Sequence, residues 1–535
     1  MKRRAFLQLA ALPAASWLPL SGERRSTPSW LAPPVGTSQS PAIVTATGAK
    51  PGLPSGVTAG DVGGGRAVIW SRTDRSARMF VEFATTERFA DPRRVRGPAA
   101  LETSDFTSRL VLTDLPAGQR IFYRVLYQDL SDLRTWSEPV TGSFNTPPAA
   151  PRDVTIAWSG DTVGQGWGIN PEWGGLRMYE TMRRAQPDVF INVGDTIYAD
   201  GPLVSEVKLD DGTLWKNVVT EAKSKVAESI ADYRGCHQYN LTDGHMRRFI
   251  AEVPQIVMWD DHEVRDNWYW ERRQDEDPRF TEKSVAVLAA RARQAFFEYN
   301  PLPVAADDPE RIYRSIPMGP LVEVFALDMR THKGANSGNR QPALDASSAL
   351  LGPAQLQWLK TSLRASTATW KIVAADLPLG LVVGDGPGRY EAVANAEPGA
   401  PLGRELEIAD LLQDLQRHRV RNVVWITADV HYCAAHHYDP ARAKFTAFDP
   451  FWEFIAGPLN AGTFGPGTLD ATFGPQVKFV GIPPGMKGNR PPSEGFQFFG
   501  TLKVSAKTRA LTAQLHDVAG KLLYSVELAP RLAAR

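Results

Sequence analysis

The chain has 535 residues, more than one small hydrophobic core accommodates, so two or more domains are expected. Apolar residues make up 43% and charged residues 22%, as in ordinary globular proteins, and the formal net charge of +1 argues against the strongly basic surface of a nucleic-acid-binding protein. With only two cysteines, Cys236 and Cys433, a disulfide framework is excluded.

The amino terminus has the features of an export signal. Arg3 and Arg4 precede an apolar run that ends near Leu20 and is short for a membrane span. Small residues at positions 14–16 suit a cleavage site, and the Arg-Arg-x-Phe-Leu pattern resembles a twin-arginine signal. We expect residues 1–32 to be a signal peptide and leader read by the twin-arginine export machinery; a basic tail or an ordinary secretory signal is the alternative. The mature protein is then periplasmic or extracellular, without a stable membrane anchor.

Composition divides the rest of the chain into three parts. Residues 33–51 are rich in Pro, Ser, Thr and Gly, which is typical of a linker. Residues 52–148 contain about seven short alternating runs separated by turn residues, which predicts a β-sandwich of the immunoglobulin or fibronectin type. In residues 149–535, strand-length apolar runs alternate with amphipathic stretches such as 284–299 and 404–417, which predicts an α/β domain.

Four β-rich runs of this domain end directly in acidic residues, and two of them continue into a histidine. The residues at these ends are Asp161, Asp195, Asp261 with His262, and Asp429 with His431. The carboxyl ends of strands in an α/β sheet are where sites assemble, so we expect these side chains to lie close together. A single Asp after a strand is more often a turn or cap residue. Four such residues, two of them beside a histidine, favour a metal site.

The residue types also indicate which cations such a site would hold. Crowded carboxylates repel one another and lose hydration unless a cation neutralises them. Oxygen ligands suit hard ions such as Ca²⁺ or Mn²⁺, whereas histidine and a phenolate suit iron. A carboxylate between two ions is typical of hydrolases that clamp the attacking and leaving oxygens of a phosphoryl group.

Three segments resemble the signature blocks of one family. Gly194-Asp-Thr-Ile-Tyr198, Trp259-Asp-Asp-His-Glu-Val264 and Ala428-Asp-Val-His-Tyr432 are similar, in order, to those of the PhoD-like alkaline phosphatase D and phospholipase D family of metallophosphoesterases. The resemblance implies a calcineurin-like αββα sandwich behind an N-terminal immunoglobulin- or fibronectin-like β-sandwich. It also implies an exported alkaline phosphatase that hydrolyses phosphate esters with a metal-activated hydroxide and releases inorganic phosphate.

The resemblance also assigns residue roles. Asp195 would bridge two metal ions, Tyr198 and His431 would bind iron, and Asp429 would bind the second ion, usually calcium in this family. Asp261 stands where the wider calcineurin-like pattern Gly-Asn-His-Glu has its Asn ligand.

Two residues beside Asp261 leave alternatives open. Asp260, its neighbour, could be the ligand instead. His262 would be a general acid or would stabilise the transition state; a structural histidine bonded to a carboxylate is the alternative.

One position departs from the family pattern. Many members have a cysteine iron ligand after the first strand of this domain, where this chain has Ser159-Gly-Asp161. Asp161 is the expected substitute. Because a carboxylate replaces a thiolate, the two or more ions could be iron with calcium, as the resemblance implies, or include manganese or another divalent ion. Cys433 is expected to be a small buried apolar residue.

Several further residues are weaker candidates. Asn267 and Asp266 follow the Asp-His-Glu block and are candidates to reach the substrate or the second ion. Arg330 follows another apolar strand and is a candidate to clamp a phosphate oxygen, with an ion pair to Asp328 or Glu323 as the alternative. The remaining candidates are expected to face solvent: His436, His437 and Arg404.

Three functions are therefore compatible with the sequence. A phosphatase acting on small phosphate monoesters is favoured, and a phosphodiesterase of the phospholipase D type is the alternative. A secreted non-catalytic binding protein with a structural metal site is less favoured, because structural calcium ligands usually come from one local loop.

Overall fold

A computed structural model describes residues 48–531 of the chain. The predicted signal and leader, together with most of the predicted linker, lie outside the described residues. Between residues 48 and 531, no helix is long and apolar enough to cross a membrane.

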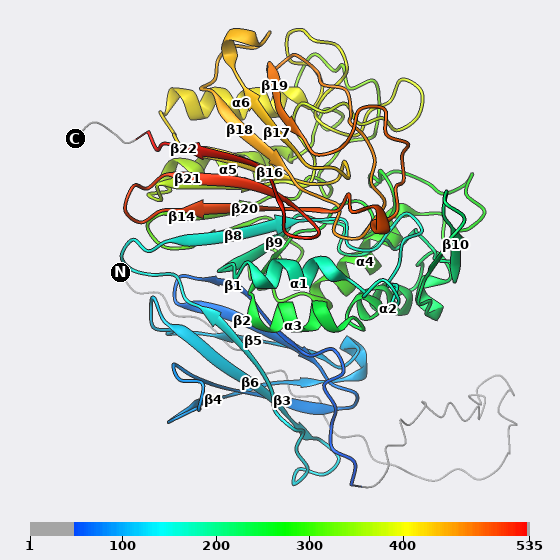
Figure 1. Ribbon diagram of the computed structural model, residues 1–535, viewed down its shortest axis with the longest axis vertical. Coiled ribbons are helices and arrows are strands. Elements are labelled where there is room, and N and C mark those ends of the chain that lie inside the picture. Colours follow the sequence, from blue (N-terminus) through cyan, green and yellow to red (C-terminus); the bar gives the residue numbers. More distant parts are fainter. Residues whose placement is uncertain (1–47, 532–535) are drawn as a thin grey trace, which may run out of the picture. The chain divides into compact units, whose positions relative to one another are not determined.

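Two large β-sheets form the centre of the fold (Figure 1). The strands of the first are β1 (Val57–Gly63), β2 (Arg66–Arg72), β5 (Thr107–Leu112), β8 (Val154–Ser159), β9 (Val189–Asn192), β12 (Gln255–Val257), β20 (Phe498–Val504), β21 (Leu511–Asp517) and β22 (Leu522–Leu528). The strands of the second are β13 (Arg314–Pro317), β14 (Val322–Ala326), β15 (Trp370–Ala374), β16 (Val423–Thr427), β17 (Ala434–Tyr438), β18 (Phe451–Ile455) and β19 (Pro475–Val480). Their spatial orders are β22-β21-β20-β8-β9-β12-β1-β2-β5 and β13-β14-β15-β16-β18-β17-β19.

Alternating apolar side chains explain why the two sheets pack on each other. Ile156 and Trp158 of β8 lie in one buried cluster with Ile426 of β16, whereas Ala157 and Trp425 belong to clusters on the outer faces. Successive side chains of a strand point to opposite faces, so strands with apolar residues at every position are buried on both sides. The core therefore lies between the sheets and continues under the helices.

Helices cover both outer faces. α1 (Arg177–Arg184) and α3 (Gly244–Glu252) pack on the nine-stranded sheet, and α5 (Gly352–Ala365) and α6 (Glu405–Arg417) pack on the seven-stranded sheet. The other elements of this part are α2 (Ile230–Asn240), α4 (Val285–Tyr299), β10 (Glu206–Lys208) and β11 (Leu214–Lys216). The layers are helix, sheet, sheet and helix, which confirms the predicted αββα class.

The N-terminal strands form the predicted β-sandwich, but one of its sheets is shared. The separate sheet contains β3 (Ala77–Ala84), β4 (Arg93–Ala100), β6 (Arg120–Asp129) and β7 (Val140–Asn145). It packs against β1, β2 and β5, and β1 pairs in parallel with β12 at Gly60 and Gln255. A Cβ at Gly60 would lie 2.2 Å from the carbonyl oxygen of Pro301, so only glycine permits this approach. The nine-stranded sheet therefore runs from the sandwich into the α/β part. This shared sheet was not expected from the sequence.

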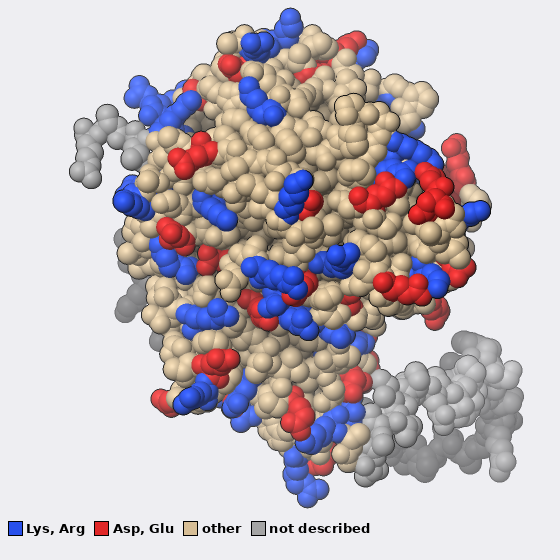
Figure 2. All heavy atoms as spheres, viewed as in Figure 1, with Lys and Arg blue, Asp and Glu red and all other residues tan. Residues whose placement is uncertain are grey.

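Charged side chains of both signs are interspersed on the face shown in Figure 2. Lysine and arginine number 60 in the whole chain and aspartate and glutamate 59, so the mixture agrees with the near-zero net charge.

Candidate metal centre

The predicted acidic residues meet where the strands end. Three groups of side chains have potential ligand atoms within 4.8 Å of one another. They are Asp161, Asp195 and His431; Asp195, Asp261 and His262; and Asp260, Asp261 and Asp429. The groups share Asp195 and Asp261, so the structure brings the four strand ends together in one cluster.

The backbone at these positions is unusual. Left-handed φ angles occur at Asp161 (60°), Asp195 (50°), Asn267 (57°), Asp429 (60°) and His431 (61°). Such conformations cost about 1–3 kcal/mol each and concentrate at functional sites, where the surrounding structure holds them. The turns therefore aim these side chains into the cluster rather than along the strands.

Gly194 allows the turn before Asp195 to pass close to the neighbouring strand end. Its φ is 118°, and a Cβ there would lie 2.4 Å from the Cβ of Asp260. A larger residue would push apart the strand ends that carry Asp195 and Asp260.

Asp161 provides the test of whether the site fits a cation. Its side chain is buried, and neither carboxylate oxygen has a hydrogen-bond partner among the described residues. Burial, and then the nearby Asp260 carboxylate, raise the pKa of Asp161 well above its usual value. A buried carboxylate without partners is costly unless a cation binds it, so the residues present fit a metal.

His431 has the hydrogen bonding of a metal-binding imidazole. Its Nδ1 donates to the carbonyl oxygen of Gly462, which leaves Nε2 facing the Tyr198 hydroxyl at 2.9 Å and Asp161 Oδ1 at 3.7 Å. Burial lowers the pKa of His431 to about 4, so the ring is neutral near pH 7. A neutral ring held through its other nitrogen is the usual state of a histidine ligand.

Asp260 and Asp261 have different surroundings. Asp260 has no exposed surface, and its Oδ1 accepts from Arg330 Nε at 2.7 Å. Asp261 Oδ2 accepts from the backbone N–H of Asn267 at 2.5 Å, and this carboxylate belongs to two of the three groups. Asp261 is therefore the better placed of the two to share a metal with Asp195.

His262 lies against a polar cavity of about 380 Å³. The cavity is lined by Gln165, Gly166, Tyr198, Asp200, Gly201, His262, Asp266 and Arg279. The imidazole stacks on Tyr198 with ring centroids 4.2 Å apart, and its Nδ1 bonds to Asp200 Oδ1 at 2.7 Å. Burial would lower the pKa of His262, but the Asp200 and Asp261 carboxylates outweigh it and raise the pKa well above its usual value.

Arg330 is at the centre of the acidic cluster and not at its surface. Its side chain has no exposed area, and its guanidinium lies within 4.0 Å of five carboxylates. They are Asp260, Asp261 (4.0 Å), Asp376 (2.9 Å), Glu391 (2.6 Å) and Asp429 (3.3 Å). The structure therefore does not place Arg330 where a phosphate clamp would lie. Asp328 accepts from the backbone N–H of Arg330, and neither Asp328 nor Glu323 is among the ion-pair partners found between residues 48 and 531.

Three acidic residues of this region were not predicted from the sequence. Asp376 follows β15 in the same way as the four predicted acids follow their strands, so the same pattern could have found it. Asp200 and Glu391 lie in loops and had no such signal.

Other candidates lie where the sequence did not predict. His436 is buried and its Nδ1 bonds to Glu453 at 3.1 Å, and Arg404 is also buried, so the expectation of solvent-facing positions was wrong for both. Cys433 is fully buried, as expected.

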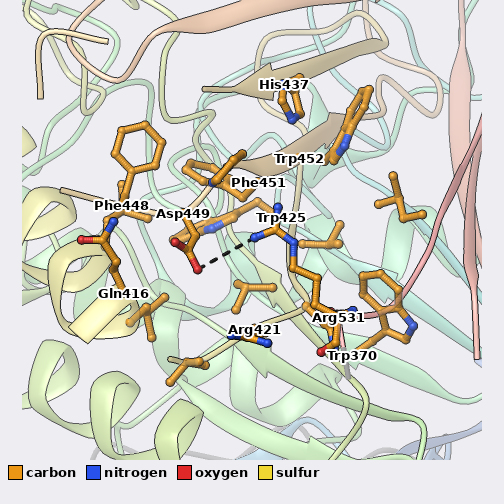
Figure 3. Close-up of a pocket in the computed structure, with 18 of the residues that line it drawn as sticks. Trp370, Gln416, Arg421, Trp425, His437, Phe448, Asp449, Phe451, Trp452 and Arg531 are labelled. Carbon is orange, nitrogen blue, oxygen red and sulfur yellow. Dashed lines mark hydrogen bonds and ion pairs between the residues drawn. The ribbon is translucent and has the colours of Figure 1, made fainter. Parts of the chain in front are cut away.

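A second cavity of about 250 Å³ lies at the amino ends of β15, β16 and β18 (Figure 3). Its walls include Trp370, Trp425 and Trp452, and Arg531 reaches Asp449 at 3.9 Å across it. It contains none of the candidate metal ligands, which lie at the opposite ends of these strands.

Comparison with known proteins supports the resemblance. Residues 156–515 match the PhoD-like phosphatase family, and residues 37–148 match the N-terminal domain of PhoD-like phosphatases. Alkaline phosphatase D of Bacillus subtilis (strain 168) is 28% identical over 310 residues, which cover 54% of this chain and 49% of that protein. The match therefore spans about half the length of this relative.

Solved structures show the same fold. The structure of PhoD superposes with a TM-score of 0.64 at 20% identity, over 90% of this chain and 92% of that chain. The purple acid phosphatase PPD1 from yellow lupin (Lupinus luteus) seeds superposes with a TM-score of 0.53 at 12% identity, over 90% of this chain and 74% of that chain. The fold is thus metallophosphoesterase-like with an N-terminal β-sandwich. Because the family match covers more than half of the sequence, the chain belongs to the PhoD-like phosphatase family.

Proposed function

We propose that this protein is an exported metal-dependent phosphatase that hydrolyses phosphate monoesters and releases inorganic phosphate. The observation that carries the proposal is the buried Asp161 beside Asp195 and His431, whose carboxylate has no hydrogen-bond partner within residues 48–531. Membership of the PhoD-like phosphatase family and the name of the relative, alkaline phosphatase D, support the reaction class. Export rests on the Arg-Arg-x-Phe-Leu pattern, which lies outside the described residues.

The chain offers ligands for two ions. Asp161, Tyr198 and His431 would hold one, Asp261 and Asp429 the other, and Asp195 would bridge them. When bound, such ions lower the pKa of water and neutralise charge on the phosphoryl oxygens. Iron with calcium is the proposed pair; because Asp161 stands in place of the family cysteine, manganese or another divalent ion is the alternative at the first position.

His262 is the proposed general acid. Asp200 holds its Nδ1, so Nε2 is directed away from this bond, and the ring lines the polar cavity. A protonated ring could deliver its Nε2 proton to the leaving alcohol oxygen. Asn267 would act indirectly, because its backbone N–H donates to Asp261 and holds that carboxylate in place. Arg279, which also lines the cavity, is half exposed and supplies a positive charge at the rim.

The test is hydrolysis of p-nitrophenyl phosphate and bis-p-nitrophenyl phosphate by protein stripped with a chelator and reloaded with iron and calcium, or with manganese. We expect no turnover after stripping, recovery on reloading, and a faster rate for the monoester. A faster rate for the diester would favour the phosphodiesterase of the phospholipase D type. No turnover of either substrate by fully loaded, folded protein would overturn the proposal and favour a metal-stabilised binding protein.

A further inference from the structure

We infer that Arg330 occupies the place of a metal cation: its guanidinium neutralises Asp260, Asp376 and Glu391 and keeps these carboxylates from acting as metal ligands. The inference rests on the proposed function in one respect, namely that metal ions occupy the neighbouring groups. It concerns how many ions the site accepts and where they bind.

The contacts of Arg330 are those of a central cation. Nε lies 2.7 Å from Asp260 Oδ1 and 2.9 Å from Asp376 Oδ2, and Nη1 lies 2.6 Å from Glu391 Oε2. Arg330, Asp260 and Asp376 have no exposed side-chain surface, and Glu391 has 2%. Water therefore does not screen these charges, and their neutralisation depends on groups of the protein.

Without the guanidinium, the buried carboxylates of Asp260, Asp376 and Glu391 would lack most of the positive charge that neutralises them. Lys333 is the other cation in contact, with Nζ 3.2 Å from Glu391 Oε2. Asp260 and Asp376 have no lysine or arginine partner except Arg330 among the described ion pairs. Removing a buried charge while its partners remain leaves uncompensated charges, which is among the most costly changes in a protein interior.

Arginine is suited to this place because its charge is permanent. The guanidinium is not deprotonated in proteins, and its planar N–H groups reach several carboxylates in fixed directions. A divalent ion would meet the same oxygens but could dissociate. The chain thus confines dissociable ions to the side of the cluster that contains Asp195. The three acids of the third group, Asp260, Asp261 (4.0 Å) and Asp429 (3.3 Å), contact Arg330 as well.

Arg404 provides a matched comparison. It is also buried, but its guanidinium donates to backbone carbonyl oxygens, including those of Tyr390 and Gly334, and it has no carboxylate partner among the described ion pairs. The substitution Arg404→Ala should disturb packing, but it should not leave buried carboxylates without a counter-charge.

The test counts ions bound per chain after equilibrium dialysis of stripped protein against Ca²⁺ and against Mn²⁺. We expect Arg330→Ala to bind one more divalent ion per chain than the wild type, and its unfolding temperature to rise more on adding Ca²⁺. Arg330→Lys, which keeps the charge, and Arg404→Ala should bind the wild-type number. An Arg330→Ala protein that folds and binds the wild-type number or fewer would overturn the inference.

A second pair of variants tests the same inference if Arg330→Ala does not fold. Asp376→Asn and Glu391→Gln keep Arg330 and remove carboxylates that we exclude as ligands, so the ion count should not change. A loss of one ion in either variant would overturn the inference. The number of bound ions is measured without hydrolysis. If the wild type binds metal but hydrolyses no ester, the proposed function is wrong, and the ion counts of the variants still test the role of Arg330.

Discussion

Asp200 and His262 form the pair on which proton delivery in the proposed reaction depends. Asp200→Asn should lower kcat for p-nitrophenyl phosphate roughly 10–100-fold and leave KM nearly unchanged, because the imidazole loses the carboxylate charge that keeps it protonated. Steady-state kinetics over a range of pH would measure the change. Asp275→Asn, which alters an exposed ion pair with Arg273, is the matched control. An unchanged kcat in Asp200→Asn would rule out the pair as the acid.

A second residue, His237, makes stability depend on pH. It is buried, its Nε2 has no hydrogen-bond partner among the described residues, and it stacks on Tyr299. Burial lowers the pKa of His237 to about 3, below the ordinary value of 6.5. The unfolded chain therefore binds the proton first, and the free energy of unfolding falls as pH decreases from 6.5 towards 3, by about 1.4 kcal/mol per unit.

The variant His237→Phe keeps the stacked ring and removes the titration. Its free energy of unfolding in urea should vary less between pH 6.5 and pH 4.5 than that of the wild type. Replacement of the exposed His418 should leave the wild-type dependence intact. Equal slopes in His237→Phe and the wild type would contradict the assignment.

At the scale of single residues, the sequence predicts what local patterns encode. An apolar strand followed directly by an acid is a local sequence pattern. It therefore predicted Asp161, Asp195, Asp261 and Asp429 as candidate metal ligands. The role of Arg330 was not predicted. Its carboxylate partners lie 46 to 99 residues away from it in the chain, and no local pattern pairs them with it.

Among the elements, Glu263 joins two strand ends of the site. Its carboxylate accepts from the backbone N–H groups of Asp195 (3.1 Å), Thr196 (2.6 Å) and Asp260 (2.7 Å). Glu263→Gln replaces one accepting oxygen with a donor that faces donors, so we expect a loss of about 2 kcal/mol in the free energy of unfolding. Urea denaturation checks this, with the exposed Glu276→Gln as control. A loss as small as that of the control would contradict the role.

The helices show which elements a sequence predicts well. The amphipathic stretches 284–299 and 404–417 became α4 and α6 with a difference of one residue at one end, because a 3.6-residue period is a local property. The parallel pairing of β1 with β12 has no local signal. It depends on Gly60 meeting Gln255 across 195 positions of chain, and the sandwich therefore could not be predicted to share its sheet.

For the whole molecule, the Asp61–Arg314 pair ties the N-terminal strands to the seven-stranded sheet. Arg314 donates to both carboxylate oxygens of Asp61, and the side chains are 14% and 7% exposed. Asp61→Asn should reduce the free energy of unfolding by about 3 kcal/mol, since it leaves a largely buried guanidinium without its counter-charge.

Thermal or urea unfolding of Asp61→Asn measures this reduction. The exposed acid of another pair, Asp132→Asn, should have little effect, because exposed pairs stabilise weakly. Equal effects of the two substitutions would show that Asp61 does not join the two parts.

If the acids at the strand ends hold the metal ions on which hydrolysis depends, metal content and turnover fall together when Asp195 is replaced. Metal analysis of purified wild type and Asp195→Asn, with p-nitrophenyl phosphate turnover measured on the same samples, checks this. We expect at least two ions per chain in the wild type, fewer in Asp195→Asn, and a loss of turnover at least in proportion to the loss of metal. Full turnover in a wild-type protein that contains no stoichiometric metal would contradict this expectation.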